Sequence, residues 1–158
     1  MDETDLRHLR RAVELAGEAL DAGDEPFGSV LVAADGTVLF EGHNEVSGGD
    51  GTRHPELAIA QWAASRMPVE ERAAATVYTS GEHCPMCAAA HAWAGLGRIV
   101  YASSSEQLTA WRESWGLPPG PVRPLPVTEV APDVPMEGPV PELAEAVRAL
   151  HARFADRS

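Results

Sequence analysis

Two short motifs constrain this chain most, because each places a proline directly after a reactive side chain. The first is HPE at residues 54–56, and the second is CPMC at residues 84–87. Proline suits the first position of a helix, where its missing N–H would have no partner anyway. Each motif therefore predicts the start of a helix, with His54 and Cys84 as the residues that cap it.

The cysteines of the second motif are suited to bind a metal ion. Cys84 and Cys87 lie one turn apart at a helix N-terminus, where free N–H groups and the helix dipole stabilise thiolates. Together with the imidazole of His54 they form a set of three ligands. Such a set leaves the fourth tetrahedral position of zinc open for a water molecule, as catalytic zinc sites require. The chain is therefore expected to bind one catalytic Zn²⁺ as its cofactor.

Glu56 follows His54 by two residues and is better placed to carry protons than to bind the metal. At a helix start the two side chains can flank one ion, and a carboxylate beside an activated water suits general acid and base catalysis. A CxxC pair alone is equally typical of a thiol redox protein, which would need neither His54 nor Glu56. The two motifs together are more specific than either one alone.

The pattern of apolar residues predicts alternating helices and strands. An amphipathic helix is expected over residues 6–20, followed by two antiparallel strands at 28–33 and 37–43 that are joined by Asp35-Gly36. Further helices are expected over residues 55–66, 85–97, 104–115 and 142–154, and further strands over 76–80, 98–102 and 125–130.

The 158 residues are expected to form a single domain over residues 1–158, since no change in composition divides the first 115 residues. Most of the chain's 13 prolines lie in residues 116–141. This proline-rich segment is expected to be extended surface chain with one edge strand, leading to the C-terminal helix.

Charge and hydropathy limit the partners and the location of the protein. The formal net charge of −12 would repel a phosphate backbone, and no basic patch is visible in the sequence, so nucleic acid is not expected as a partner. No apolar run has the length of a membrane span, and the first residues do not resemble a signal peptide. Two cysteines that are three residues apart fit a reducing compartment, so we expect a cytoplasmic protein.

With these motifs, the chain resembles the zinc-dependent cytidine and purine deaminase family, whose signature combines H-x-E with P-C-x-x-C. The resemblance covers residues 25–102, about half of the chain. It implies an α/β fold, a three-layer α/β/α sandwich with a five-stranded mixed sheet, as in cytidine deaminase. By matching positions, it implies that His54, Cys84 and Cys87 bind zinc and that Glu56 is the catalytic proton shuttle.

Within this family, residues 26–30 and 41–44 look most like guanine deaminases. The resemblance implies that Asn44 bonds the base, that Phe27 packs on it, and that Trp93 occupies an aromatic position of the pocket. Simpler interpretations stay open for all three residues. Phe27 and Trp93 would also fit an ordinary core, and Asn44 would also fit the end of a strand.

Three departures from the family pattern concern the substrate. His83 stands where relatives usually have proline, and lining the pocket, bonding the substrate and capping the loop are all open roles for it. Pro55 stands where relatives often have an alanine whose N–H bonds the base, so that hydrogen bond is absent or reassigned. The proline-rich C-terminal third aligns with no guanine deaminase tail that we recognise.

The resemblance implies a homodimeric enzyme that hydrolytically deaminates a small amino-heterocycle and releases ammonia. A free nucleobase or nucleoside is expected as the substrate, with a guanine-like purine favoured. Cytosine, cytidine or a triazine is the first alternative, and an adenosine of transfer RNA is disfavoured by the net charge. The thiol redox protein stays open, as does a silent partner subunit with the deaminase fold, although such a subunit would have no need of Glu56.

Overall fold

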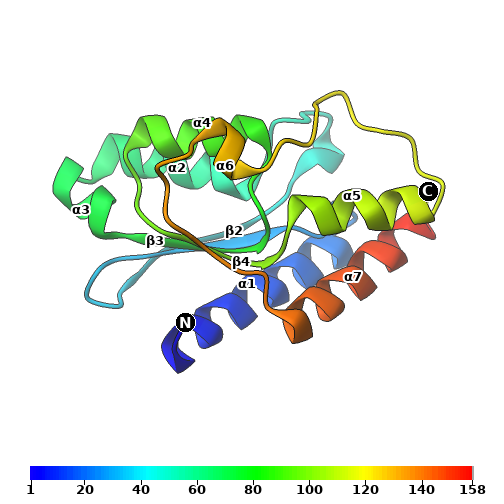
Figure 1. Ribbon diagram of the computed structural model, residues 1–158, viewed down its shortest axis with the longest axis horizontal. Helices are drawn as coiled ribbons and strands as arrows, with labels where there is room; N and C mark the ends of the chain where they lie inside the picture. The colour runs from blue at the N-terminus through cyan, green and yellow to red at the C-terminus, as the bar shows by residue number, and fades with distance from the viewer. Residues whose placement is uncertain (158) are drawn as a thin grey trace.

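A five-stranded sheet separates two layers of helices in the computed structural model, which describes residues 1–157 (Figure 1). The sheet has the order β2-β1-β3-β4-β5. Strand β1 pairs antiparallel with β2 and β3, whereas β3, β4 and β5 are parallel. The strand bounds are Gly28–Val32 for β1, Val38–His43 for β2, Thr76–Gly81 for β3, Ile99–Ser103 for β4 and Met136–Glu137 for β5. This arrangement confirms the predicted α/β/α sandwich.

The helices cover both faces of the sheet. Helices α2 (Pro55–Arg66), α3 (Val69–Ala74), α4 (Pro85–Ala94) and α6 (Val127–Val130) lie on one face, and α1 (Glu3–Asp21) and α7 (Pro141–Ala155) lie on the other (Figure 1). Helix α5 (Ser105–Ser114) follows β4 at one end of the sheet. None of these helices within residues 1–157 combines the length and the apolar character that a membrane span needs.

Each central strand directs alternate side chains to the two faces of the sheet, and these side chains fill the apolar core on each face. Val30 and Tyr78 pack with Leu9 of α1, whereas their chain neighbours Leu31 and Val77 pack with the helices of the opposite face. Successive strand residues point to opposite faces, so each strand contributes to two apolar layers. Burial of each large apolar side chain contributes about 1.5–3 kcal/mol. The two cores together hold the sheet rigidly between the helix layers.

The predicted hairpin is confirmed. Gly36 has a φ of 93°, and the side chain of Asp35 accepts a hydrogen bond from the Thr37 N–H at 2.9 Å. A residue with a side chain is strained at such a positive φ, so the glycine makes the tight turn possible.

The C-terminal third differs from the sequence prediction. The strand expected over residues 125–130 is wrong, because this stretch contains α6, and the fifth strand is the two-residue β5 at Met136–Glu137. Pro124 and Pro126 have no N–H for a strand ladder, whereas proline fits the entrance of a helix. The short α3 was also not predicted.

Three chain segments meet at one edge of the sheet. The parallel strands β3 and β4 end there, and β1 begins there because it runs antiparallel to β3. Strand β3 leads into α4, and β1 is preceded by Phe27. Loops at the carboxyl ends of parallel strands commonly build ligand sites, so this edge is where a site is expected.

Substitution of Gly28 should destabilise the fold. A Cβ atom at Gly28 would collide with the backbone of α1 at Ala12 and at Ala16, whose nitrogen lies 2.6 Å away. We expect Gly28→Ala to lower the free energy of unfolding by about 1–3 kcal/mol, as overpacking does. Gly17→Ala is the matched control, because no atom lies within 4 Å of a Cβ at that helical position. The control should raise stability by about 0.5–1 kcal/mol in urea unfolding, and equal effects of the two substitutions would contradict the close approach of α1 to Gly28.

Candidate active site

The two proline motifs start neighbouring helices, as predicted. His54 is the N-cap of α2 with Pro55 in its first turn, and Cys84 is the N-cap of α4 with Pro85 in its first turn. The two helices pack side by side on the same face of the sheet (Figure 1). Their N-termini thereby bring the imidazole and the two thiols together.

The three side chains have the spacing of a zinc site. The Nδ1 atom of His54 lies 3.5 Å from Sγ of Cys84 and 3.6 Å from Sγ of Cys87, and the three donor atoms lie within 4.8 Å of one another. Zn–S bonds of about 2.3 Å and Zn–N bonds of about 2.0 Å at a tetrahedral angle give an S–N separation of about 3.5 Å. These residues therefore fit a zinc ion bound through His54 Nδ1, with one position left for another ligand.

The charges at the three donors favour metal binding. A hydrogen bond from Cys87, together with the contact with His54, lowers the pKa of the Cys84 thiol to about 4. The same contact with Cys84 raises the pKa of His54 to about 9. The pKa of the buried Cys87 is raised, mainly because it donates to Cys84. One thiolate is thus stabilised even before a cation is added, and thiolate is the form that binds metal.

Glu56 lies beside these donors in a buried position. Only 5% of the residue is exposed, and the Ser29 hydroxyl donates to its Oε1 atom at 3.1 Å. Ser29 Oγ also lies 2.9 Å from Oγ1 of Thr79. Side chains of β1 and β3 therefore hold the Glu56 carboxyl group in place. Burial raises the pKa of Glu56 to about 7. A carboxyl group with such a pKa can both accept and return a proton near neutral pH.

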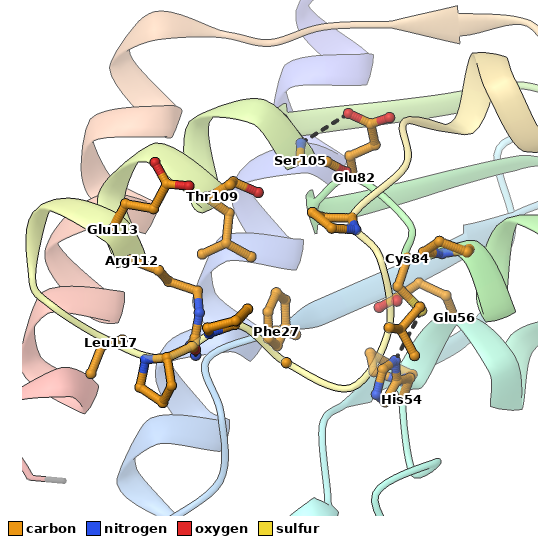
Figure 2. Close-up of a pocket in the computed structure, with 18 residues that line it drawn as sticks. Phe27, His54, Glu56, Glu82, Cys84, Ser105, Thr109, Arg112, Glu113 and Leu117 are labelled. Atoms are coloured by element: carbon orange, nitrogen blue, oxygen red, sulfur yellow. Dashed lines mark hydrogen bonds between the residues drawn. The ribbon is translucent and has the colours of Figure 1, made fainter.

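A cavity of about 330 Å³ opens next to this cluster (Figure 2). His54, Glu56 and Cys84 line one end, and Phe27 and Pro55 also line the cavity. The opposite wall comes from α5 and from the segment after it. That wall is lined by Ser105, Leu108, Thr109, Arg112, Glu113, Leu117, Pro118, Pro119, Gly120, Val122 and Pro124. The cavity has the size and the mostly apolar lining of a small-molecule site.

Phe27 is supported from behind by the C-terminal helix. Its ring packs edge-on against His151 of α7, with 4.9 Å between the ring centroids. Burial lowers the pKa of His151 to about 4, so this imidazole is neutral at physiological pH. The end of the chain therefore helps to fix the wall of the cavity near the metal-binding cluster.

The structure does not bring every predicted pocket residue to this cavity. Asn44 is buried, and its Oδ1 atom accepts from the Val46 N–H at 3.0 Å. His83 is buried with its ring edge-on to His91, and neither of its ring nitrogens has a hydrogen-bond partner in the described residues. Trp93 is 90% exposed on α4. None of Asn44, His83 and Trp93 lines the cavity, and a substrate role for each stays a prediction.

Sequence reasoning missed the residues that form the cavity's outer wall. Glu82 was not singled out, yet its carboxylate accepts from the Ser105 N–H at 2.9 Å (Figure 2). The same carboxylate also accepts from the Val127 N–H at 2.8 Å. These bonds join the first turns of α5 and α6 to the loop that carries Cys84. The helical spacing of Ser105, Thr109 and Arg112 could have suggested a common face, but nothing in the sequence says what that face meets.

Comparison with known proteins agrees with the geometry. Residues 2–103 match the family described as the cytidine and deoxycytidylate deaminase zinc-binding region. The chain is 36% identical to a probable cytosine deaminase from Schizosaccharomyces pombe over 68% of this chain and 65% of that protein. It is 39% identical to a guanine deaminase from Bacillus subtilis over 60% of this chain and 62% of that protein. Both alignments span slightly less than two thirds of the relative's own length.

A guanine deaminase structure from Nitrosomonas europaea has a similar fold, with a TM-score of 0.71 and 21% identity. The superposition covers 94% of this chain and 83% of the other. It therefore includes most of the C-terminal third, for which the sequence alone suggested no counterpart. At this identity the likeness concerns the fold.

Loss of the Glu82 carboxylate should loosen the outer wall of the cavity. Each hydrogen bond to a charged group is worth about 1.5–3 kcal/mol, so we expect Glu82→Ala to accelerate amide exchange at Ser105 and Val127 by about tenfold or more. Hydrogen–deuterium exchange should also be faster across residues 116–126. Glu106→Ala is the matched control. Glu106 lies in the first turn of α5, next to Ser105, but no hydrogen bond or ion pair joins its exposed side chain to the described residues. Unchanged exchange in Glu82→Ala would refute the tether.

Proposed function

Because this chain belongs to the cytidine and deoxycytidylate deaminase zinc-binding family, we propose that it hydrolytically deaminates a free nucleobase or nucleoside, with a guanine-like purine preferred. The observation that carries the proposal is the cavity that opens directly onto His54, Cys84 and Glu56. A small heterocycle can enter this cavity, and its amino-bearing carbon can approach both the metal-binding cluster and the buried carboxyl group.

The residues at the inner end of the cavity divide the chemistry between them. Held by His54, Cys84 and Cys87, a zinc ion would lower the pKa of a water molecule and so supply a nucleophile at neutral pH. Glu56 takes a proton from this water molecule while the water oxygen bonds to the amino-bearing ring carbon of the substrate. Glu56 delivers this proton to the adjacent ring nitrogen, and it then carries the proton of the newly formed hydroxyl group to the amino group. The carbon–nitrogen bond then breaks, which leaves an oxo heterocycle and ammonia.

Several features support a purine over a single-ring substrate. A cavity of about 330 Å³ leaves room for a fused bicyclic base. Phe27 offers an aromatic ring, and Glu113 offers a carboxylate to accept from ring N–H or amino groups. The relative named as a guanine deaminase is 39% identical over the aligned region. Cytosine stays the alternative, because the relative named as a probable cytosine deaminase is 36% identical over a longer stretch, 109 residues against 97.

The proposal includes a homodimer in the cytoplasm. Trp93 is a large aromatic side chain with 90% exposure on α4, which supports a contact with a second copy of the chain. Both cysteines are free, and a reducing compartment would keep them available as metal ligands. The net charge of −12 supports a small molecule rather than transfer RNA as the substrate.

An ammonia-release screen tests the proposed activity. The zinc-loaded protein would be assayed with guanine, adenine, cytosine, their nucleosides and amino-triazines, with ammonia measured by a coupled assay. We expect guanine to have the highest kcat/KM. Preference for cytosine would overturn the purine assignment, and ammonia from none of these compounds would overturn the deaminase activity itself.

Substitution of Glu56 tests its catalytic role. Glu56→Gln keeps the size of the side chain but removes the group that accepts a proton, so we expect kcat to fall by about 10²–10⁴-fold. Zinc content, measured by mass spectrometry, should stay at the wild-type value because Glu56 is not among the three clustered donors. Near wild-type turnover would show that another group carries the proton. Loss of zinc would show instead that Glu56 is a ligand.

A further inference from the structure

The outer wall of the cavity contains one strong hydrogen-bond donor that the proposed chemistry does not use. Five of the residues that line the cavity are prolines, which have no N–H to offer a substrate. The Ser105 N–H is already bound to Glu82. Arg112, by contrast, carries a guanidinium group with five N–H donors and a permanent positive charge.

Arg112 is held in place but keeps most of its donors free of partners. Its Nη2 atom donates to the Pro118 carbonyl at 3.1 Å, which ties the guanidinium to the segment after α5. Among the described residues, no carboxylate forms an ion pair with it, although Glu82 and Glu113 line the same cavity. Both oxygens of Glu82 are occupied by backbone N–H groups. A cation in a largely apolar wall calls for an acceptor on the molecule that fills the cavity.

We propose that Arg112 binds the oxo-and-ring-nitrogen edge of an oxopurine and thereby determines specificity for guanine-like bases. The inference rests on the proposed deaminase function. Figure 2 shows Arg112 on the opposite side of Phe27 from His54, Cys84 and Glu56. In guanine the amino group that leaves is on C2, and the O6 and N7 acceptors lie on the edge that faces away from C2. A base with C2 at the inner end therefore directs O6 and N7 toward the outer wall.

The chemistry of this edge distinguishes bases. The planar fork of arginine matches two neighbouring acceptors, and the O6/N7 edge of guanine is the pair that arginine most often binds in nucleic acids. A 6-amino purine presents a donor in place of O6, so it would meet the guanidinium with a donor against a donor. A dianionic phosphate fits less well, because Glu82 and Glu113 line the same cavity and the chain carries a net charge of −12.

The test compares guanine with 2,6-diaminopurine, which has an amino group in place of O6 and no hydrogen on N1 but keeps N7 and the 2-amino group. We expect Arg112→Met to lower kcat/KM for guanine on the order of ten- to a hundredfold and to change that for 2,6-diaminopurine by less than about threefold. Arg112→Lys should give an intermediate value, because a lysine ammonium keeps the charge but lacks the fork. Arg148→Met is the matched control, since Arg148 stacks on Trp115 outside the cavity, and its kinetics should equal those of the wild type.

A binding measurement separates this inference from the proposed reaction. Hypoxanthine keeps O6 and N7 but lacks the amino group that would leave, so calorimetry with zinc-loaded protein reports recognition alone. We expect Arg112→Met to weaken hypoxanthine binding by the same factor, with zinc content unchanged. If Arg112→Met weakens hypoxanthine binding in this way but neither the wild type nor any variant deaminates a substrate, the proposed function is overturned and the role of Arg112 is supported.

Three results would overturn the role of Arg112. One is an equal fall for guanine and 2,6-diaminopurine in Arg112→Met, which would indicate a structural role for the side chain. Another is an affinity of Arg112→Met for hypoxanthine that equals the affinity of the wild type. The third is a preference of the wild type for guanosine monophosphate over guanine, combined with loss of this preference in Arg112→Met alone. That pattern would show that the arginine binds a phosphate.

Discussion

Helices α2 and α4 lie side by side with their N-termini at the same edge of the sheet, and the candidate site depends on this packing. His54 and Cys84 cap the two helices, so the donors meet because the helices do. Proline in each first turn fixes the entrance angle without the loss of a hydrogen bond. The neighbouring helix starts also supply free N–H groups and a favourable potential for thiolate. A shift of either helix would separate the donors by more than a zinc ion can bridge.

The buried carboxyl group shows how the sheet serves this cluster. Glu56 is removed from water, and the hydroxyls of Ser29 and Thr79 form a polar layer between it and the strands. Desolvation raises the pKa of Glu56, whereas His54 opposes that shift. Burial of this ionisable group costs free energy, and perturbed pKa values of this kind cluster at functional sites.

The cavity divides into an inner end and an outer wall with different origins in the chain. The inner end lies within residues 2–103, the region that matches the deaminase family. The outer wall lies in residues 105–124, beyond that region, and Glu82 joins the two parts through its bonds to the starts of α5 and α6. The outer wall therefore belongs to a part of the chain that the family match does not cover.

The helix entrances, the metal-binding motifs and most of the elements could be predicted from the residues alone, because they depend on local spacing and on residues such as Pro55 and Pro85. Prediction failed over residues 125–130, where apolar residues suggested a strand but prolines favoured a short helix. The residues that form the outer wall of the cavity emerged only from the folded chain. Trp93 is exposed on α4, whereas Arg112 of α5 lines the wall. The reason is physical: periodicity fixes which residues share a face, but only long-range packing fixes what that face meets.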